Sequence, residues 1–354
     1  MTSVREAKEA LDKIISKSRV HLYKPIQIAE ILYHHRVKPD FDLTDLESYR
    51  NISKKWRDEV SIELLGRICT SSARFQDDLF NENAVPPRLI NILAAENEAK
   101  NGIVEAYVYS LFDNKHSQLN EALNVVKQSN PETFSLKRFI DSFWDEPGLK
   151  RSIDKVYEIV VYSLFSSLIE AMDLKVSISF SEDKFDLVKE FNDFTAKVLS
   201  LDFNKSIHVE NAKVYRVGVT NAADRGLDMY SNWGPAIQIK HLSLDEELAE
   251  NIVNSVSSDK IVIVCKSAEK GTITSLLNQI GWKSKIQSIV TEDDLIDWYE
   301  KGLRGKYKTI LGQKLLDTLQ EQVEEEFPSM EEKETIISKR KYSGKYNDVL
   351  WGKI

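Results

Sequence analysis

Three short strand-like runs lie close together in the second half of the chain, and they constrain the fold more than any other feature. They are "AKVYRVGVT" (212–220), "GLDMYS" (226–231) and "PAIQIKHL" (235–242). The turn "NWGP" separates the last two and predicts a hairpin. An amphipathic helix over 152–173 precedes the three runs, and a helix over 245–257 and the strand "KIVIVCKS" (260–267) follow them. This order predicts an α/β (α+β) fold, with a mixed central sheet flanked by helices.

The rest of the chain predicts a helical region before this unit and a short tail after it. Residues 1–150 are mostly helical, with separate amphipathic segments over 103–112, 115–128 and 135–145. We expect a catalytic or binding domain over 151–310 that includes a short strand at 176–180 and a single helix over 181–201. Residues 311–354 predict an acidic helix and a basic, aromatic end.

Composition excludes several classes of protein. The net charge of −8, from 48 basic and 56 acidic residues, does not exclude DNA as a partner, because positive charge can be concentrated in one cleft. Two widely spaced cysteines argue against a disulfide framework. The most apolar run, 156–172, carries two glutamates and predicts a buried helix, not a membrane span. With no signal peptide at the first residues, we expect a cytoplasmic protein without membrane contact.

The predicted hairpin gathers a small set of polar groups. On a strand, residues two apart share a face, so Gln238 and Lys240 point together while Ile237 and Ile239 point into the core. The turn folds Asp228 back beside Gln238. A carboxylate and an amide oxygen suit Mg²⁺, and an ammonium group can orient a water and stabilise charge on a phosphate. The set suits hydrolysis of a phosphodiester, although Asp228 and Lys240 could equally form an ordinary cross-strand ion pair.

This arrangement resembles the PD-(D/E)xK nuclease core, in which an acidic residue, a hairpin and an acidic-x-lysine triplet follow one another. The chain departs from the usual pattern at Leu227, where proline is common, and at Gln238, where an acidic residue is usual. With "SRVHLYKPIQIAEILYHHR", "NISKKWRDE", "GRICTSSARFQDDLF" and the stretch "TNAADRGLDMYSNWGPAIQIKHLSL", most of the chain is similar to type II restriction endonucleases of the HaeII kind.

The resemblance implies an activity, a cofactor and partners. It implies Mg²⁺-dependent cleavage of double-stranded DNA at a palindrome, purine-GCGC-pyrimidine, by a homodimer that is paired with a cognate DNA methyltransferase. Asp228, Gln238 and the Ile239 carbonyl would hold the metal, and Lys240 would position the attacking water. Residues 151–310 would form the catalytic domain, and the helical region over 1–150 would serve DNA recognition and dimerisation. Two rivals stay open: a repair or structure-specific nuclease of the same superfamily, and a non-catalytic DNA-binding protein on a decayed nuclease core.

Other candidate residues rest on weaker patterns. A carboxylate that compensates for the neutral Gln238 could come from Asp224 or Glu190, with Glu170 a poorer choice. The candidates for DNA contact are Ser71, Ser72, Arg74, Arg225 and Trp233. The serine-rich segment could instead cap a helix, and the tryptophan could pack on the core. The end "KRKYSGKY" (339–346) suits either a phosphate backbone or a solvated tail.

Overall fold

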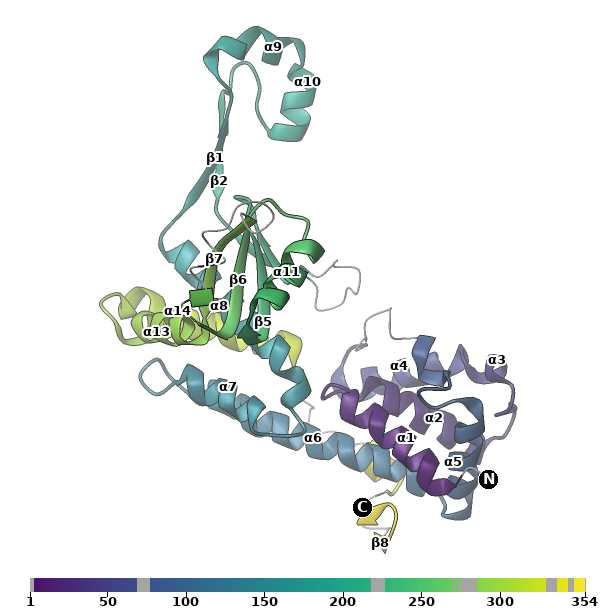
Figure 1. Ribbon diagram of the computed structural model, residues 1–354. Helices are drawn as coiled ribbons and strands as arrows, with labels where there is room; N and C mark the ends of the chain where they lie inside the picture. Colours follow the sequence, from purple (N-terminus) through teal and green to yellow (C-terminus); the bar gives the residue numbers. More distant parts are fainter. Residues whose placement is uncertain are drawn as a thin grey trace.

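The computed structural model describes residues 3–68, 77–217, 227–269, 271–272, 275, 285–328, 336–342 and 347–353. These residues form a helical body and a sheet-containing body, which the long helix α6 joins (Figure 1). No helix in these ranges is long and apolar enough to cross a membrane. The mixed α/β architecture that the sequence predicts is confirmed.

The helical body contains the first part of the chain. Its helices are α1 (Val4–Lys17), α2 (Tyr23–Val37), α3 (Leu46–Tyr49), α4 (Ile52–Leu65), α5 (Pro87–Ala99) and the first half of α6 (Ile103–Lys127). Their apolar faces meet in one hydrophobic core around α2, whose residues Ile28, Ile31 and Leu32 are buried. Helix α7 (Leu136–Trp144) packs instead on the second half of α6 and on the sheet body.

Helix α6 connects the two hydrophobic cores. We predicted two segments, over 103–112 and 115–128, but the structure has one helix of 25 residues. Its buried residues Val108 and Phe112 belong to the core of the helical body, whereas Leu119 and Leu123 belong to the core of the sheet body. The apolar face of α6 packs on one core along its first half and on the other along its second half, while the helix continues without a break. In the sequence this change of partner has the form of two separate apolar segments.

A five-stranded sheet forms the centre of the second body. The strand order is β3-β4-β5-β6-β7, with bounds β3 Val214–Arg216, β4 Met229–Ser231, β5 Ala236–Leu244, β6 Ile261–Ala268 and β7 Ile286–Thr291. Strands β3, β4 and β5 are antiparallel, and β5, β6 and β7 are parallel.

Helices cover both faces of this sheet. One face packs on α8 (Ile153–Ala171) and α13 (Glu292–Arg304), with α14 (Lys308–Glu326) packed against these two helices, and the other face packs on α11 (Glu246–Ser255). Ile237 and Ile239 belong to the core on the α8 face, as their alternation with Gln238 and Lys240 predicts. The order helix, three strands, helix, strand is therefore present as α8, β3, β4, β5, α11 and β6.

A projecting segment interrupts this order between α8 and β3. Strands β1 (Lys175–Ser179) and β2 (Ile207–Asn211) form an antiparallel ribbon that extends beyond the sheet to a small helical tip (Figure 1). We call residues 175–211 the arm. The single helix predicted over 181–201 is wrong, because the tip is divided into a 3₁₀ turn at Glu182–Lys184, α9 (Phe185–Glu190), α10 (Asn192–Phe194) and a π turn at Thr195–Leu199.

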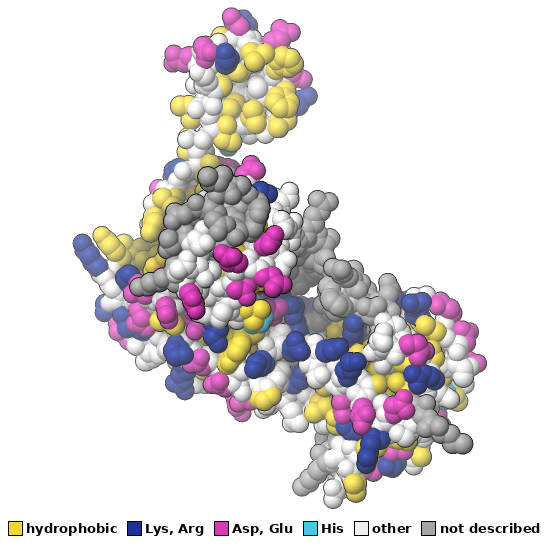
Figure 2. All heavy atoms as spheres, viewed as in Figure 1, with side chains coloured by type: hydrophobic (Ala, Val, Ile, Leu, Met, Phe, Trp, Pro, Cys, Tyr) yellow, Lys and Arg dark blue, Asp and Glu magenta, His cyan; other side chains and the backbone are white. Residues whose placement is uncertain are grey.

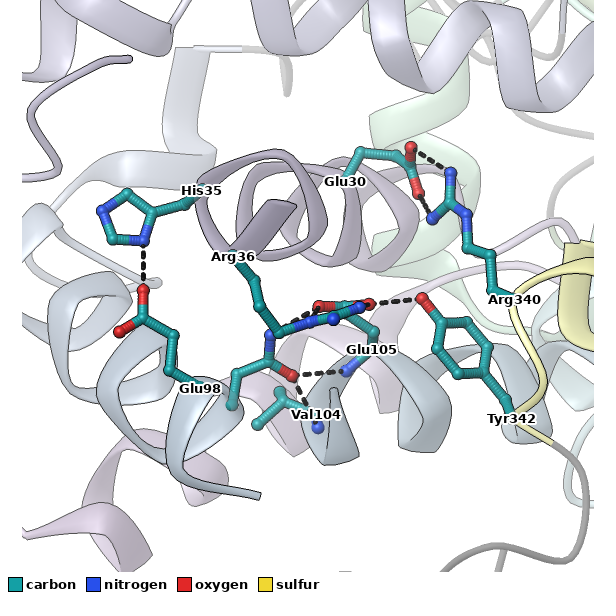
Figure 3. Close-up of polar contacts among 9 residues, drawn as sticks. Glu30, His35, Arg36, Glu98, Val104, Glu105, Arg340 and Tyr342 are labelled. Carbon is teal, nitrogen blue, oxygen red and sulfur yellow. Dashed lines mark hydrogen bonds and ion pairs between the residues drawn. The ribbon is translucent and has the colours of Figure 1, made fainter. Parts of the chain in front are cut away.

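The end of the chain returns to the helical body. Residues 336–342 and 347–353 contain α15 (Ile336–Lys339), β8 (Asn347–Asp348) and β9 (Gly352–Lys353), and Tyr342 and Trp351 enter the core of that body. Arg340 donates two hydrogen bonds to Glu30, at 2.7 and 2.9 Å, and the Tyr342 hydroxyl donates to Glu105 (Figure 3). The prediction of a phosphate-binding or solvated tail is therefore wrong for Arg340 and Tyr342, which are bound within the protein.

The ion pairs of two adjacent residues, Arg340 and Lys339, give a direct test of this attachment. Glu30 is only 1% exposed, so Arg340→Ala leaves a buried carboxylate without its arginine, although the Tyr109 hydroxyl still donates to it. The variant is expected to lower the free energy of unfolding by about 3–5 kcal/mol. Lys339 pairs with Glu63 on the surface, and Lys339→Ala should cost less than about 1 kcal/mol. Urea denaturation measures both; equal effects would contradict the structural role of Arg340.

Candidate active site

A tight turn brings β4 and β5 together. Gly234 has a φ of 124°, a conformation that glycine adopts without strain, and Ser231 donates backbone and side-chain hydrogen bonds to the Pro235 carbonyl at 3.1 and 3.0 Å. Met229 then pairs with Ile237. Continuing this antiparallel register by one residue places Asp228 opposite Gln238, as the sequence predicts.

The Asp228 carboxylate is the point where the polar groups of the site meet. Its Oδ2 accepts a hydrogen bond from the Ile239 backbone N–H at 2.7 Å and another from the Gln238 side-chain amide. The Lys240 ammonium lies 3.9 Å from the same oxygen. The structure thus brings together Asp228, Gln238, Ile239 and Lys240, although Ile239 meets the carboxylate through its N–H group.

Burial sets the electrostatics of this carboxylate. It raises the pKa of Asp228 above its ordinary value, while the Lys240 charge and the Ile239 N–H act in the opposite direction. The Asp228 carboxylate has lost part of its hydration on folding, and a bound metal cation would replace that lost interaction. An ordinary ion pair on the surface differs from this site, because its carboxylate stays hydrated.

Helix α8 adds a second carboxylate that the sequence did not indicate. Glu158 is buried, and its pKa is raised to about 7 by burial, with the nearby Asp228 charge adding to the effect and Lys155 opposing it. Lys155 donates to both Glu158 oxygens, at 2.9 and 2.7 Å. The Glu158 carboxylate thus senses the Asp228 charge, and the Asp228 carboxylate senses the charges of Lys240 and Lys155, so side chains of both signs gather beside the middle of β5.

The Gln238 side chain fits a metal-binding role better than a packing role. It is 1% exposed, and its amide nitrogen donates to Asp228 while its Oε1 is buried without a hydrogen-bond partner among the described residues. A buried acceptor without a partner is costly in a structural position. Within the described ranges no group of three His, Cys, Asp or Glu residues is arranged to hold a metal. Asp228 and Gln238 supply two oxygen atoms of the kind that a hard cation such as Mg²⁺ prefers, and the Glu158 carboxylate on α8 is close enough to sense the Asp228 charge.

Other predicted site residues are not brought to this place. Glu190 is exposed on α9 in the arm, and Glu170 pairs with Lys314 at 2.5 Å. Trp233 is 42% exposed in the β4–β5 turn, at the opposite end of the hairpin from Lys240. The remaining candidates lie outside the described residues: Asp224, Arg225, Ser71, Ser72 and Arg74.

Basic side chains gather near the site instead. Lys and Arg side chains form a row between the sheet body and the helical body (Figure 2). Near the active site, the ammonium groups of Lys266 and Lys150 lie 3.8 and 4.7 Å from the centre of a Trp144 ring, and the His241 ring lies 6.4 Å from the same residue. Burial lowers the pKa of His241 and the charges of Lys240 and Lys266 act in the same direction, so both lysines lie near this part of β5 although the chain is acidic overall.

Comparison with known proteins identifies the family. The family model of the HaeII restriction endonuclease matches residues 7–342. The chain is 60% identical over 329 residues to "Type II restriction enzyme HaeII" of Haemophilus aegyptius. The aligned region covers 93% of this chain and 94% of that protein. The chain belongs to the HaeII restriction endonuclease family. It is also 56% identical over 328 residues to "Type II restriction enzyme NgoBI" of Neisseria gonorrhoeae, covering 93% of each chain.

Membership of the HaeII family makes the chain a type II restriction endonuclease, as the sequence predicts. No solved structure matches the chain. The geometry of the β4–β5 hairpin is therefore the observation from which the active site of this family member can be assigned.

The raised pKa of Glu158 predicts a pH-dependent affinity for divalent ions. Only the ionised carboxylate binds a cation, so the dissociation constant for Ca²⁺ should fall by up to about tenfold for each pH unit as pH rises towards about 7, and should level off above it. Calorimetry on wild type and Glu158→Gln at several pH values measures this. Identical pH profiles for the two proteins would exclude Glu158 as a ligand.

Proposed function

We propose that this endonuclease hydrolyses double-stranded DNA with Mg²⁺ through a PD-(D/E)xK-type site. Its parts are Asp228, Gln238 and Lys240 on the hairpin and Glu158 on α8. The observation that carries this proposal is the meeting of Lys240, the Gln238 amide and the Ile239 N–H at one oxygen of the partly buried Asp228 carboxylate. The target is a palindrome, purine-GCGC-pyrimidine, which is implied by the family resemblance.

Glu158 explains how the site works with a neutral glutamine in place of the usual acidic residue. A site with Asp228 alone would offer a divalent ion one negative charge, and Glu158 raises this to two. The Gln238 oxygen, which has no hydrogen-bond partner among the described residues, is free to contribute a neutral ligand. The Ile239 carbonyl completes the proposed protein ligands.

The chain's own groups supply orientation and charge for the reaction. A bound Mg²⁺ would polarise the scissile phosphate and make water a better nucleophile. The Lys240 ammonium holds the attacking water and stabilises negative charge on the phosphate. The water oxygen bonds to phosphorus as the bond from phosphorus to the 3′ oxygen breaks, leaving 5′-phosphate and 3′-hydroxyl ends.

The lysines near the site fit a DNA backbone. Lys266 lies near His241, the residue after Lys240 in β5, while Lys155 lies at Glu158 and Lys150 at Trp144. These lysines would neutralise phosphates on either side of the cleaved bond. The helical region over residues 1–150 would shape specificity, and the domain over 151–310 would catalyse. We propose further that the enzyme is a homodimer, since a palindrome presents two identical half-sites. It would act in the cytoplasm beside a cognate methyltransferase.

Digestion of a plasmid of known sequence tests this function. Wild type with Mg²⁺ should give discrete bands whose ends map to purine-GCGC-pyrimidine sites, and chelation should abolish them. Asp228→Asn keeps an acceptor for the Ile239 N–H but removes the charge, so cleavage should slow by about 100-fold or more with the melting temperature preserved. Asp259→Asn, an exposed aspartate before β6, is the matched control and should cut at the wild-type rate.

Three outcomes would contradict the proposal. A smear, or cutting only at junctions, would favour a repair or structure-specific nuclease. No cleavage by wild type across a broad panel of DNA would favour a non-catalytic DNA-binding protein. Cleavage by Asp228→Asn at the wild-type rate would place the active site elsewhere.

A further inference from the structure

We propose that the apolar face of the arm is a dimerisation surface that packs against a second copy of this chain. The inference deepens the proposed homodimer by naming its contact surface, and in that respect it rests on the proposed function. The arm carries no residue of the active site, so the two proposals can fail independently.

The tip of the arm turns its apolar stripe towards solvent. Leu187, Phe191, Phe194 and Val198 follow one another at intervals of four, three and four residues, and they are 57%, 54%, 52% and 62% exposed. Such spacing places side chains on one face of a helical segment, and this face normally meets a hydrophobic core. In Figure 2 apolar side chains cover much of the visible side of the tip.

The arm has almost no core of its own. Only Val188, Thr195 and Leu201 are buried along its length. An isolated two-stranded ribbon is marginally stable in water, and the tip adds only short, interrupted helical turns. The folded arm therefore needs a partner that buries its apolar residues.

The exposed apolar residues of the arm are numerous enough to form the centre of an interface. The large apolar residues that are exposed on the arm and at its root are Met172, Leu174, Ile178, Phe185, Leu187, Phe191, Phe194, Val198, Phe203, Ile207 and Val209. With side chains of roughly 150–200 Å² each, their exposed fractions amount to about 1,000 Å² over both faces of the ribbon, since Ile178 lies on the face opposite Ile207 and Val209. A stable dimer buries about 800 Å² on each partner, polar atoms included, so the apolar residues on one face of the arm would supply a large part of such an interface.

Charge argues for a protein partner and against DNA or an anionic membrane. Residues 175–211 contain seven acidic and five basic residues, a net charge of −2, which would repel phosphates. A second copy is present wherever the chain is made, and a two-fold axis presents the same apolar patch on both partners. The second copy is therefore the occupant that the surface fits.

The position of the arm leaves the active site accessible. Asn232, in the β4–β5 turn, donates hydrogen bonds to Glu210 and to the Asn211 carbonyl at the base of the arm, at 3.0 and 2.9 Å. Lys240 lies in the middle of β5, beyond this turn. The arm therefore leaves the sheet beside the turn and not beside Lys240, so its interface does not compete with DNA for the catalytic residues.

Sedimentation velocity without DNA, at micromolar concentration, tests the surface. Wild type should sediment as a dimer, and the double variant Phe191→Glu, Phe194→Glu as a monomer. Ile310→Glu is the matched control, because Ile310 is 60% exposed on α14, outside the arm, and this variant should stay dimeric. A shortened arm, in which Asn-Gly joins the paired residues Val176 and Glu210, should also be monomeric and should keep the cooperative thermal unfolding of the two bodies.

The outcomes separate this inference from the nuclease proposal. The cleavage-deficient variant Asp228→Asn should remain dimeric, so dimer formation can be measured independently of DNA cleavage. A monomeric wild type, or a dimer that survives both arm variants, would overturn the inference even if the enzyme cuts DNA. Arm-dependent retention of DNA by a monomeric wild type would overturn it as well.

Discussion

The contact on which the site depends is the one between the Asp228 carboxylate and the backbone N–H of Ile239 in the neighbouring strand. At 2.7 Å, it fixes the carboxylate opposite Gln238 and within 3.9 Å of the Lys240 ammonium. The carboxylate can be buried at this position because these groups replace the water it loses on folding. The raised pKa of Asp228 shows that these groups do not fully offset the loss of water, and a bound divalent cation would offset the remainder.

The rest of the sheet body serves to hold this contact in place. Ile237 and Ile239 bind β5 to the core on the α8 face, and the parallel strands β6 and β7 extend the sheet beyond it. Helix α8 then carries Glu158 and Lys155 to the same place. The helical body is joined to the sheet body through α6, and Arg340 attaches the end of the chain to the helical body through Glu30.

The sequence predicted the hairpin part of the site because that part is local. Alternation along β5 and the turn before it determine where Asp228, Gln238 and Lys240 point. Glu158 lies 70 positions before Asp228, on a helix whose apolar pattern indicates burial but not what its polar residues meet. Its presence in an otherwise apolar run was the one available signal.

The arm shows the same limit, because the spacing of Leu187, Phe191 and Phe194 predicts a buried face without saying which surface covers it. The basic tail was misjudged because its partner, Glu30, lies at the other end of the chain.

The central claim is that Glu158 provides the negative charge that Gln238 lacks. A charge-exchange experiment tests it most directly, by measuring single-turnover cleavage at saturating Mg²⁺ for Glu158→Gln and for the double variant Glu158→Gln, Gln238→Glu. The single variant should lose about 100-fold or more in rate, and the double variant should regain at least about tenfold, because the second carboxylate is restored beside Asp228. A double variant that is no faster than the single variant would contradict the account, as would a Glu158→Gln enzyme with wild-type activity.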